Sequence, residues 1–204
     1  MPLPVSDARS LLTRRSIVCE GYEREDGLLD VEGRLQDVNA YPIENEWRGE
    51  VAAGKSVHEM HLRLRIDTDL VIRHVDACIE AAPYPICREV LQPLQRLVGL
   101  KIAGGFKQQV RSLVGHTEGC THVLTLIEAL GTVAIRTLAG KSRRRGEAVF
   151  NIFGSRDPKR PPLIDTCHSY AASSPIVKKL WPQYYRPRTA EANVDGVESE
   201  EPKP

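Results

Sequence analysis

The sequence predicts an α+β protein, in which an N-terminal antiparallel meander sheet packs against a C-terminal set of about three to four helices. Two observations support this fold class. Apolar and polar residues alternate through the first 80 residues, as in strands that bury one face. The period then changes to that of helices, and strands followed by helices are typical of α+β folds. The clearest alternation covers residues 58–66, where one face carries His58, Met60, Leu62, Leu64 and Ile66.

The predicted meander is built from alternating segments separated by turn residues. Strands are expected at residues 15–22, 28–38, 58–66 and 70–77. The pair Asp26-Gly27 is a hairpin signal between the first two strands. Residues 40–54 are expected to form a polar loop, because they contain Pro42, Gly49 and Gly54.

The second half of the chain carries helical patterns. One helix is expected to follow Pro83, Pro85 and Cys87 and to run through Leu97, and a second to follow Gly104-Gly105 and to run through Leu113. Further helices are expected from Gly119 to Gly140 and over roughly residues 175–180. A short strand or two is expected within residues 148–168. The basic run at residues 141–145 suits a helix C-terminus. It is interpreted as a solvated loop and not as a nucleic-acid patch, because no aromatic residues are interleaved with it.

Length and composition favour one domain. The 204 residues are divided into an entry arm at 1–14, a single α+β domain at 15–186 and a disordered acidic tail at 187–204. The net charge of +1 gives no overall field for nucleic acid. No apolar run reaches the roughly 18–20 residues of a membrane span, and the N-terminus lacks signal-peptide features. A cytoplasmic protein is therefore expected, with no nucleic-acid or membrane partner.

Cysteine and histidine carry the strongest chemical signal. The five cysteines are an odd number, which argues against a closed disulfide framework. Cys120 is placed where a helix begins, and free N–H groups there stabilise a thiolate. His122 follows two residues later, and the pair Cys167-His168 comes in a late loop. We expect Cys120, His122 and His168 to form one cluster, with His58 facing inward toward it.

Two kinds of site are compatible with these residues. In a metal site, zinc or iron is bound by ligands from the set His58, Cys120, His122, Cys167 and His168. The spacings are not those of zinc fingers, and only one of the adjacent Cys167 and His168 is expected to ligate. In a thiol site, Cys120 is the nucleophile and His122 or His168 is the base. These residues could also simply pack in the core.

Other residues are interpreted structurally. Three cysteines are expected to be core thiols, namely Cys19, Cys78 and Cys87. Four carboxylates fall on neighbouring strands, namely Glu20, Asp30, Glu32 and Glu59. They could form an acid/base pair, but the solvated face of a half-exposed sheet is the more common arrangement.

Five motifs appear in order along the chain: residues 19–27, Asp30-Val31-Glu32-Gly33, His58-Glu59-Met60, Gly119-Cys120-Thr121-His122, and Thr166-Cys167-His168-Ser169-Tyr170. Over roughly residues 15–185 the chain resembles a bacterial family known only as a domain of unknown function. The resemblance implies a bacterial cytoplasmic protein and a link to aromatic-compound catabolism, and it carries no catalytic role.

The function expected from these observations is a small metal- or thiol-dependent enzyme of hydrolase or lyase type, acting on a small organic molecule. The first alternative is a sulfur-transfer or iron–sulfur scaffold protein that uses Cys120. The second is a structural protein whose cysteines and histidines only pack.

Overall fold

The computed structural model describes residue 4 and residues 7–146, 160–161 and 163–188. The chain divides into two compact units, residues 1–152 and residues 153–204, and each is described by itself. The expected strands within 148–168 and the expected tail fall mostly or wholly outside the described residues. The prediction of one domain over residues 15–186 stays a prediction.

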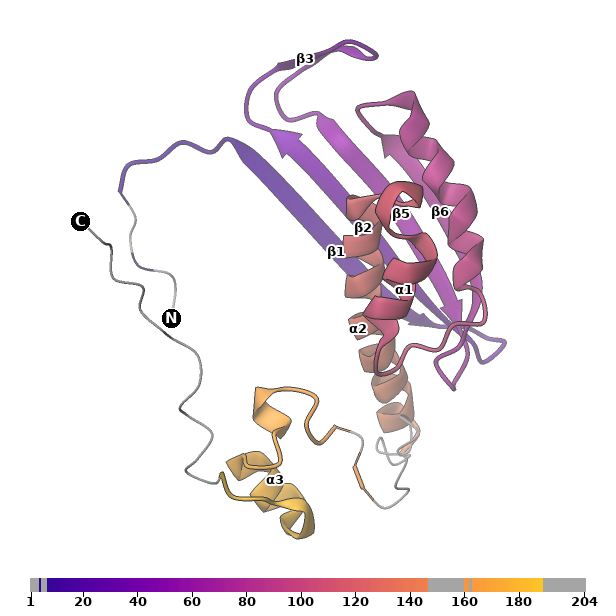
Figure 1. The fold of residues 1–204 in the computed structure, drawn as a ribbon, viewed down its shortest axis with the longest axis vertical. Helices are drawn as coiled ribbons and strands as arrows, with labels where there is room; N and C mark the ends of the chain where they lie inside the picture. Colours follow the sequence, from indigo (N-terminus) through magenta and orange to yellow (C-terminus); the bar gives the residue numbers. More distant parts are fainter. Residues whose placement is uncertain (1–3, 5–6, 147–159, 162, 189–204) are drawn as a thin grey trace, which may run out of the picture. The chain divides into compact units, whose positions relative to one another are not determined.

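The first unit is built on a four-stranded antiparallel sheet. Its strands are β1 (Thr13–Glu23), β2 (Leu29–Asn39), β5 (Ser56–Ile66) and β6 (Ile72–Ala81), in the order β1-β2-β5-β6. Sequential neighbours pair throughout, so the predicted meander is confirmed. Figure 1 shows helices on one face of this sheet. The sheet and the helices that follow it in the chain confirm the α+β class.

A small hairpin lies where the sequence predicted only a loop. Strands β3 (Ile43–Asn45) and β4 (Gly49–Val51) pair in a separate two-stranded sheet between β2 and β5. The hairpin lies beyond one end of the main sheet (Figure 1). The Asn45 side chain accepts hydrogen bonds from the N–H groups of Trp47 and Arg48, at 3.0 and 2.9 Å. Such Asx turns are local and easily hidden in a polar stretch.

The helices of the first unit follow the sheet. They are the 3₁₀ helix η1 (Pro85–Leu97), α1 (Phe106–Val114), the 3₁₀ turn η2 (His116–Glu118) and α2 (Thr121–Arg144). The second unit contains η4 (His168–Tyr170), α3 (Pro175–Leu180) and η5 (Pro182–Tyr184). The predicted helix positions are confirmed, but η1 is a 3₁₀ helix, and Pro93 within it cannot donate an α-helical hydrogen bond.

Helix α2 packs directly on β2 at Gly33, where the strand has no side chain. A Cβ atom added to Gly33 would lie 2.7 Å from Leu126 Cδ1 and 3.1 Å from Leu130 Cδ2. Both leucines are almost fully buried, as are Leu35 and Leu64 on the sheet. The glycine therefore lets the helix approach the sheet closely at this point.

The basic run belongs to the last turns of α2, so the predicted end at Gly140 was wrong. Gly140 has no neighbour within 4 Å that a Cβ would meet and is tolerated inside the helix. Lys141 is buried, and its Nζ donates a 2.6 Å hydrogen bond to the Gly27 carbonyl. Arg145 donates to Glu23 at 2.6 Å. The run thus ties the helix end to the β1–β2 turn, where the sequence indicated only a solvated loop.

One helix in the described part of the chain, α2, is long and apolar enough to cross a membrane by length and composition alone. Its apolar side chains are part of the core formed with the sheet. The structure is therefore compatible with a soluble protein.

Candidate functional site

Three strands carry a row of polar side chains at one end of the sheet, on the helix-covered face. Arg15 on β1 lies opposite Asp37 on β2, and Asp37 lies opposite His58 on β5. The row follows directly after the buried pair Leu35 and Met60, which also lie opposite each other. Residue alternation brings these polar groups to the same face as the core.

A bulge re-aims the end of this row. Pairing between β2 and β5 shifts after Asp37, so that Val38 lies opposite Ser56 and Val57 is left over. Bulges bend a strand locally and occur often beside functional sites. Here the irregularity falls directly beside His58.

The start of α2 brings the remaining groups to the row. Cys120 is the N-cap residue, with φ −125° and ψ 130°, and its carbonyl accepts from the Leu124 N–H. The preceding Gly119 lies so close to the Val114 carbonyl that a Cβ would be 2.0 Å from its oxygen. Cysteine is an unusual N-cap, and its side chain makes no capping hydrogen bond. A local rule is broken here, as is common at functional sites.

The side chains meet around Asp37. The His58 Nδ1 lies 3.1 Å from Asp37 Oδ2, and the His122 Nε2 lies 3.3 Å from the same oxygen. The two imidazole rings stack with centroids 3.9 Å apart and an angle of 25° between planes. On the other side of its ring, His122 Nδ1 lies 3.6 Å from Cys120 Sγ. His122 therefore joins the thiol to the carboxylate.

Arg15 fixes the carboxylate from the outer side. Its Nε and Nη2 donate to the two Asp37 oxygens at 2.7 and 2.8 Å. Burial raises the pKa of Asp37, but the hydrogen bonds and charge of Arg15 outweigh burial, so the pKa lies below its usual value. Asp37 is an ionised acceptor at neutral pH. Arg15 also lies close enough to Cys120 for their charges to interact.

Both histidines are neutral at pH 7. Burial lowers the pKa of His58, and the charges of Arg15 and Arg48 lower it further. Together they outweigh Asp37, which raises it. Burial also lowers the pKa of His122, with further lowering from His58 and Arg15. Each neutral imidazole has one N–H, and an ionised carboxylate can only accept. The nitrogens that face Asp37 therefore carry the protons, and His122 Nδ1 is left as an acceptor toward the Cys120 thiol.

The structure brings together three of the residues that the sequence singled out, namely His58, Cys120 and His122. Their expected partners Cys167 and His168 lie in the second unit, where His168 opens η4 and Cys167 is exposed. Their membership of the cluster stays a prediction.

Two residues of the site were missed from sequence, namely Asp37 and Arg15. Asp37, His58 and His122 offer three ligand atoms within 4.8 Å of one another, so they could hold a metal ion. This set differs from the expected ligand set in using a carboxylate. Cys120 lies on the far side of the His122 ring from it.

The remaining cysteines are only partly as predicted. Cys19 and Cys87 pack against the core, and burial raises the pKa of the Cys19 thiol. Cys78 is exposed, so its assignment to the core was wrong. It lies opposite His61 on the open face of the sheet, because the alternation of β6 buries Val75 and Ile79 instead.

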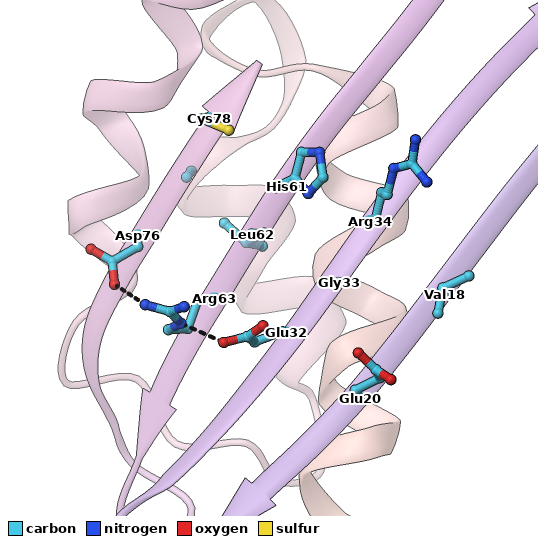
Figure 2. A pocket seen from close by; sticks show the side chains of 11 residues that line it. Val18, Glu20, Glu32, Gly33, Arg34, His61, Leu62, Arg63, Asp76 and Cys78 are labelled. Carbon is cyan, nitrogen blue, oxygen red and sulfur yellow. Dashed lines mark hydrogen bonds and ion pairs between the residues drawn. The ribbon is translucent and has the colours of Figure 1, made fainter. Parts of the chain in front are cut away.

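The open face of the sheet holds a cavity of about 510 Å³, shown in Figure 2. Several of its charged groups already have partners in neighbouring side chains. Arg63 donates to Glu32 at 2.7 Å and lies 3.7 Å from Asp76. Glu20, which lies opposite Glu32, accepts from the Tyr22 hydroxyl at 2.8 Å. Arg63 thus joins Glu32 and Asp76 across three neighbouring strands, and neither Cys120 nor His122 lines the cavity.

The fold and the site together define an α+β protein with a cysteine–histidine–aspartate cluster where a helix begins over the end of a meander sheet. The chain belongs to the family described as Protein of unknown function (DUF2889), whose pattern matches residues 13–136. This range includes the whole cluster and confirms the resemblance to a family of unknown function. Comparison with curated proteins and with solved structures gives no match.

Proposed function

We propose that the protein is a small cysteine-dependent enzyme, with Cys120 as nucleophile, His122 as base and Asp37 as the group that orients His122. The observation that carries this proposal is the chain of contacts through one imidazole: Cys120 Sγ to His122 Nδ1 at 3.6 Å, and His122 Nε2 to Asp37 Oδ2 at 3.3 Å. Nucleophile, base and orienting carboxylate in series are the arrangement that activates thiols and hydroxyls in unrelated enzymes.

The proton path follows from the tautomer. Because Asp37 takes the Nε2–H of His122, the Nδ1 lone pair accepts the proton of the thiol as sulfur attacks an electrophilic carbon. For an ester or thioester substrate, the leaving alcohol or thiol then takes that proton from Nδ1. Water, activated by the same nitrogen, hydrolyses the acyl–cysteine bond and restores the free thiol. The distance of 3.6 Å is long for proton transfer, as is common before substrate binds.

The start of α2 supplies hydrogen-bond donors that could stabilise an oxyanion. The first N–H groups of a helix have no acceptor within the helix, and they point past the N-cap residue. An oxyanion formed at the carbon attacked by Cys120 would lie near these donors and near the positive end of the helix dipole. Substrate is therefore proposed to be a small organic acyl compound, handled in the cytoplasm of a bacterium, with aromatic-pathway compounds as the first class to test.

The alternative functions are less well supported. An iron–sulfur scaffold needs several thiolates around one site. The candidate ligand groups found within the described residues contain no cysteine. Sulfur transfer needs only one nucleophilic thiol, so Cys120 would serve there too. A sulfur-transfer function predicts a persulfide on Cys120 and no acyl hydrolysis.

The first test compares two thiols by alkylation with iodoacetamide followed by peptide mass spectrometry. Cys78 is exposed and makes no hydrogen bond to a histidine within the described residues, while Cys120 is only partly exposed. Activation by His122 should nevertheless make Cys120 the faster to react at pH 7. The variant His122→Asn should slow Cys120 by about tenfold or more and leave Cys78 unchanged. Faster alkylation of Cys78 in the wild type would overturn the proposal.

The second test uses a panel of short acyl thioesters and aryl esters. Wild type should hydrolyse at least one of them, with a burst of acyl-enzyme on Cys120 that mass spectrometry detects. Cys120→Ser should lose both turnover and the adduct, while Cys78→Ser should retain them. Asp37→Asn should lower turnover by about 100-fold or more, because the amide no longer fixes the tautomer of His122.

A further inference from the structure

We propose that Asp37, His58 and His122 also form a binding site for a single zinc ion, and that zinc there prevents His122 from serving Cys120 as a base. The second part rests on the proposed function. The first part stands on the geometry of the three side chains alone.

The ligand atoms are already close to the spacing that zinc requires. Zinc binds imidazole nitrogen at about 2.0–2.1 Å and carboxylate oxygen at about 2.0–2.2 Å, so two ligands of a tetrahedral ion lie about 3.4 Å apart. Asp37 Oδ2 lies 3.1 Å from His58 Nδ1 and 3.3 Å from His122 Nε2. All three atoms lie within 4.8 Å of one another. The two nitrogens come from rings that stack at 25° between planes, so the rings would splay to direct both lone pairs at one ion.

The donor set suits zinc more than calcium or magnesium. Two imidazoles and one carboxylate are borderline ligands, whereas calcium and magnesium prefer oxygen. Three protein ligands leave a fourth position for water, as in catalytic and regulatory zinc sites. The three side chains are each between 18% and 20% exposed, so an ion can enter from solvent.

Arg15 is the competitor of the ion. Its guanidinium holds both oxygens of Asp37, and its positive charge repels a cation. The Arg15 side chain is 46% exposed, so it can swing into solvent when zinc arrives. Replacing Arg15 should therefore strengthen zinc binding, whereas the loss of a true ligand should weaken it.

Zinc and the thiol relay need opposite tautomers of His122. When Nε2 gives its lone pair to the ion, the single proton of the neutral imidazole must be on Nδ1. Nδ1 then faces Cys120 as a donor and can no longer accept the thiol proton. His58 undergoes the matching shift, from Nδ1–H to Nε2–H, so no proton is released overall.

A second group on the open face provides a control. Glu59, His61 and Glu80 also offer ligand atoms within reach of one another. However, the Arg34 guanidinium and the Ser56 hydroxyl already bind Glu59, and Glu80 is 61% exposed. We expect no tight zinc site there, so His61→Asn is the matched control for His58→Asn.

The experiment measures zinc binding by calorimetry on the full chain, in a background in which exposed Cys78 and Cys167 are changed to serine. That background should bind one zinc per chain. His58→Asn should weaken binding by about 100-fold, since losing even a group that only hydrogen-bonds a zinc ligand costs about 10–100-fold in affinity. Arg15→Gln should bind more tightly, and His61→Asn and Cys120→Ser should bind as the background does. Circular dichroism and melting temperature of each variant show whether it is folded.

The same proteins are then alkylated with and without saturating zinc. Zinc should slow the alkylation of Cys120 by about tenfold in the background protein. In His58→Asn, which still has His122 and Asp37, the alkylation rate of Cys120 should be the same with and without zinc. Equal zinc affinity of the folded His58→Asn variant, or no binding by the background, overturns the site. Binding without any change in alkylation overturns the competition. An unreactive Cys120 in every protein, with the zinc pattern intact, supports the zinc site and overturns the proposed thiol function.

Discussion

Gly33→Ala tests whether the contact between α2 and β2 positions the site. The new methyl group would be 2.7 Å from Leu126 Cδ1 and 3.1 Å from Leu130 Cδ2, both closer than van der Waals contact. Both leucines are at most 1% exposed, so neither can move into solvent. The helix must instead lift from the sheet or the leucines must leave their rotamers.

The cost follows from overpacking. An extra methyl in a well-packed core destabilises by about 1–3 kcal/mol. Alanine also restricts the unfolded chain more than glycine does, and this effect stabilises the folded protein by about 0.4–1 kcal/mol. The middles of these two ranges give a net loss of about 1.3 kcal/mol in urea unfolding. Because Leu126 is one helical turn after His122, lifting α2 should also slow alkylation of Cys120.

Gly140→Ala is the matched control. It lies in the same helix, and nothing within 4 Å would meet its Cβ. Helix propensity alone should make this variant more stable by about 0.5–1 kcal/mol. If Gly33→Ala unfolds at the same urea concentration as wild type, or a higher one, then α2 does not pack on β2 as described. The argument for the position of Cys120 would fail with it.

Further predictions concern other parts of the first unit. Lys141→Met should cost about 1–3 kcal/mol in urea unfolding, since the Gly27 carbonyl loses its buried donor; an unchanged midpoint would contradict this. Asp67 accepts from the Val71 N–H and from Arg73, and these bonds outweigh burial and lower its pKa from 3.8. A lowered carboxyl pKa contributes stability that is present above 3.8 and lost as pH falls through the lower value. Asp67→Asn should therefore be less stable than wild type at pH 7, by about 1–3 kcal/mol. That difference should narrow on acidification below pH 3.8, and a gap that stays constant from pH 7 to pH 2 would argue against the role of the ionised carboxylate.

The sheet was predictable because its information is local. Alternation placed Leu62, Leu64 and Ile66 on one face, and the Asp26-Gly27 signal placed the first hairpin. The 3₁₀ character of η1 and the continuation of α2 past Gly140 were not predictable in this way. The end of α2 depends on Lys141 reaching the Gly27 carbonyl, a contact between residues 114 positions apart.

Half of the site could also have been found from the sequence. Folding the first hairpin about Asp26 places Arg15 opposite Asp37, as the structure has it. The signals that stood out were cysteines, histidines and the carboxylates of the polar face, whereas Asp37 lies on the apolar face. Opposite charges across a hairpin, at the end of a buried alternation, were the signal that was available.

The alternation of residues 58–66 placed His58 on the inward face, but its pairing with Asp37 depended on a register that no local pattern contains. His58 meets Asp37 only after the β3–β4 hairpin and the bulge at Val57 have set how β5 returns along β2. A return shifted by one residue would turn Glu59 toward the helix in place of His58. Cys120 and His122 reach the same point because Gly33 lets α2 approach β2 and Gly119 lets its first turn approach Val114. The cluster at Asp37 therefore depends on two glycines and one strand register, although neither glycine has a reactive side chain.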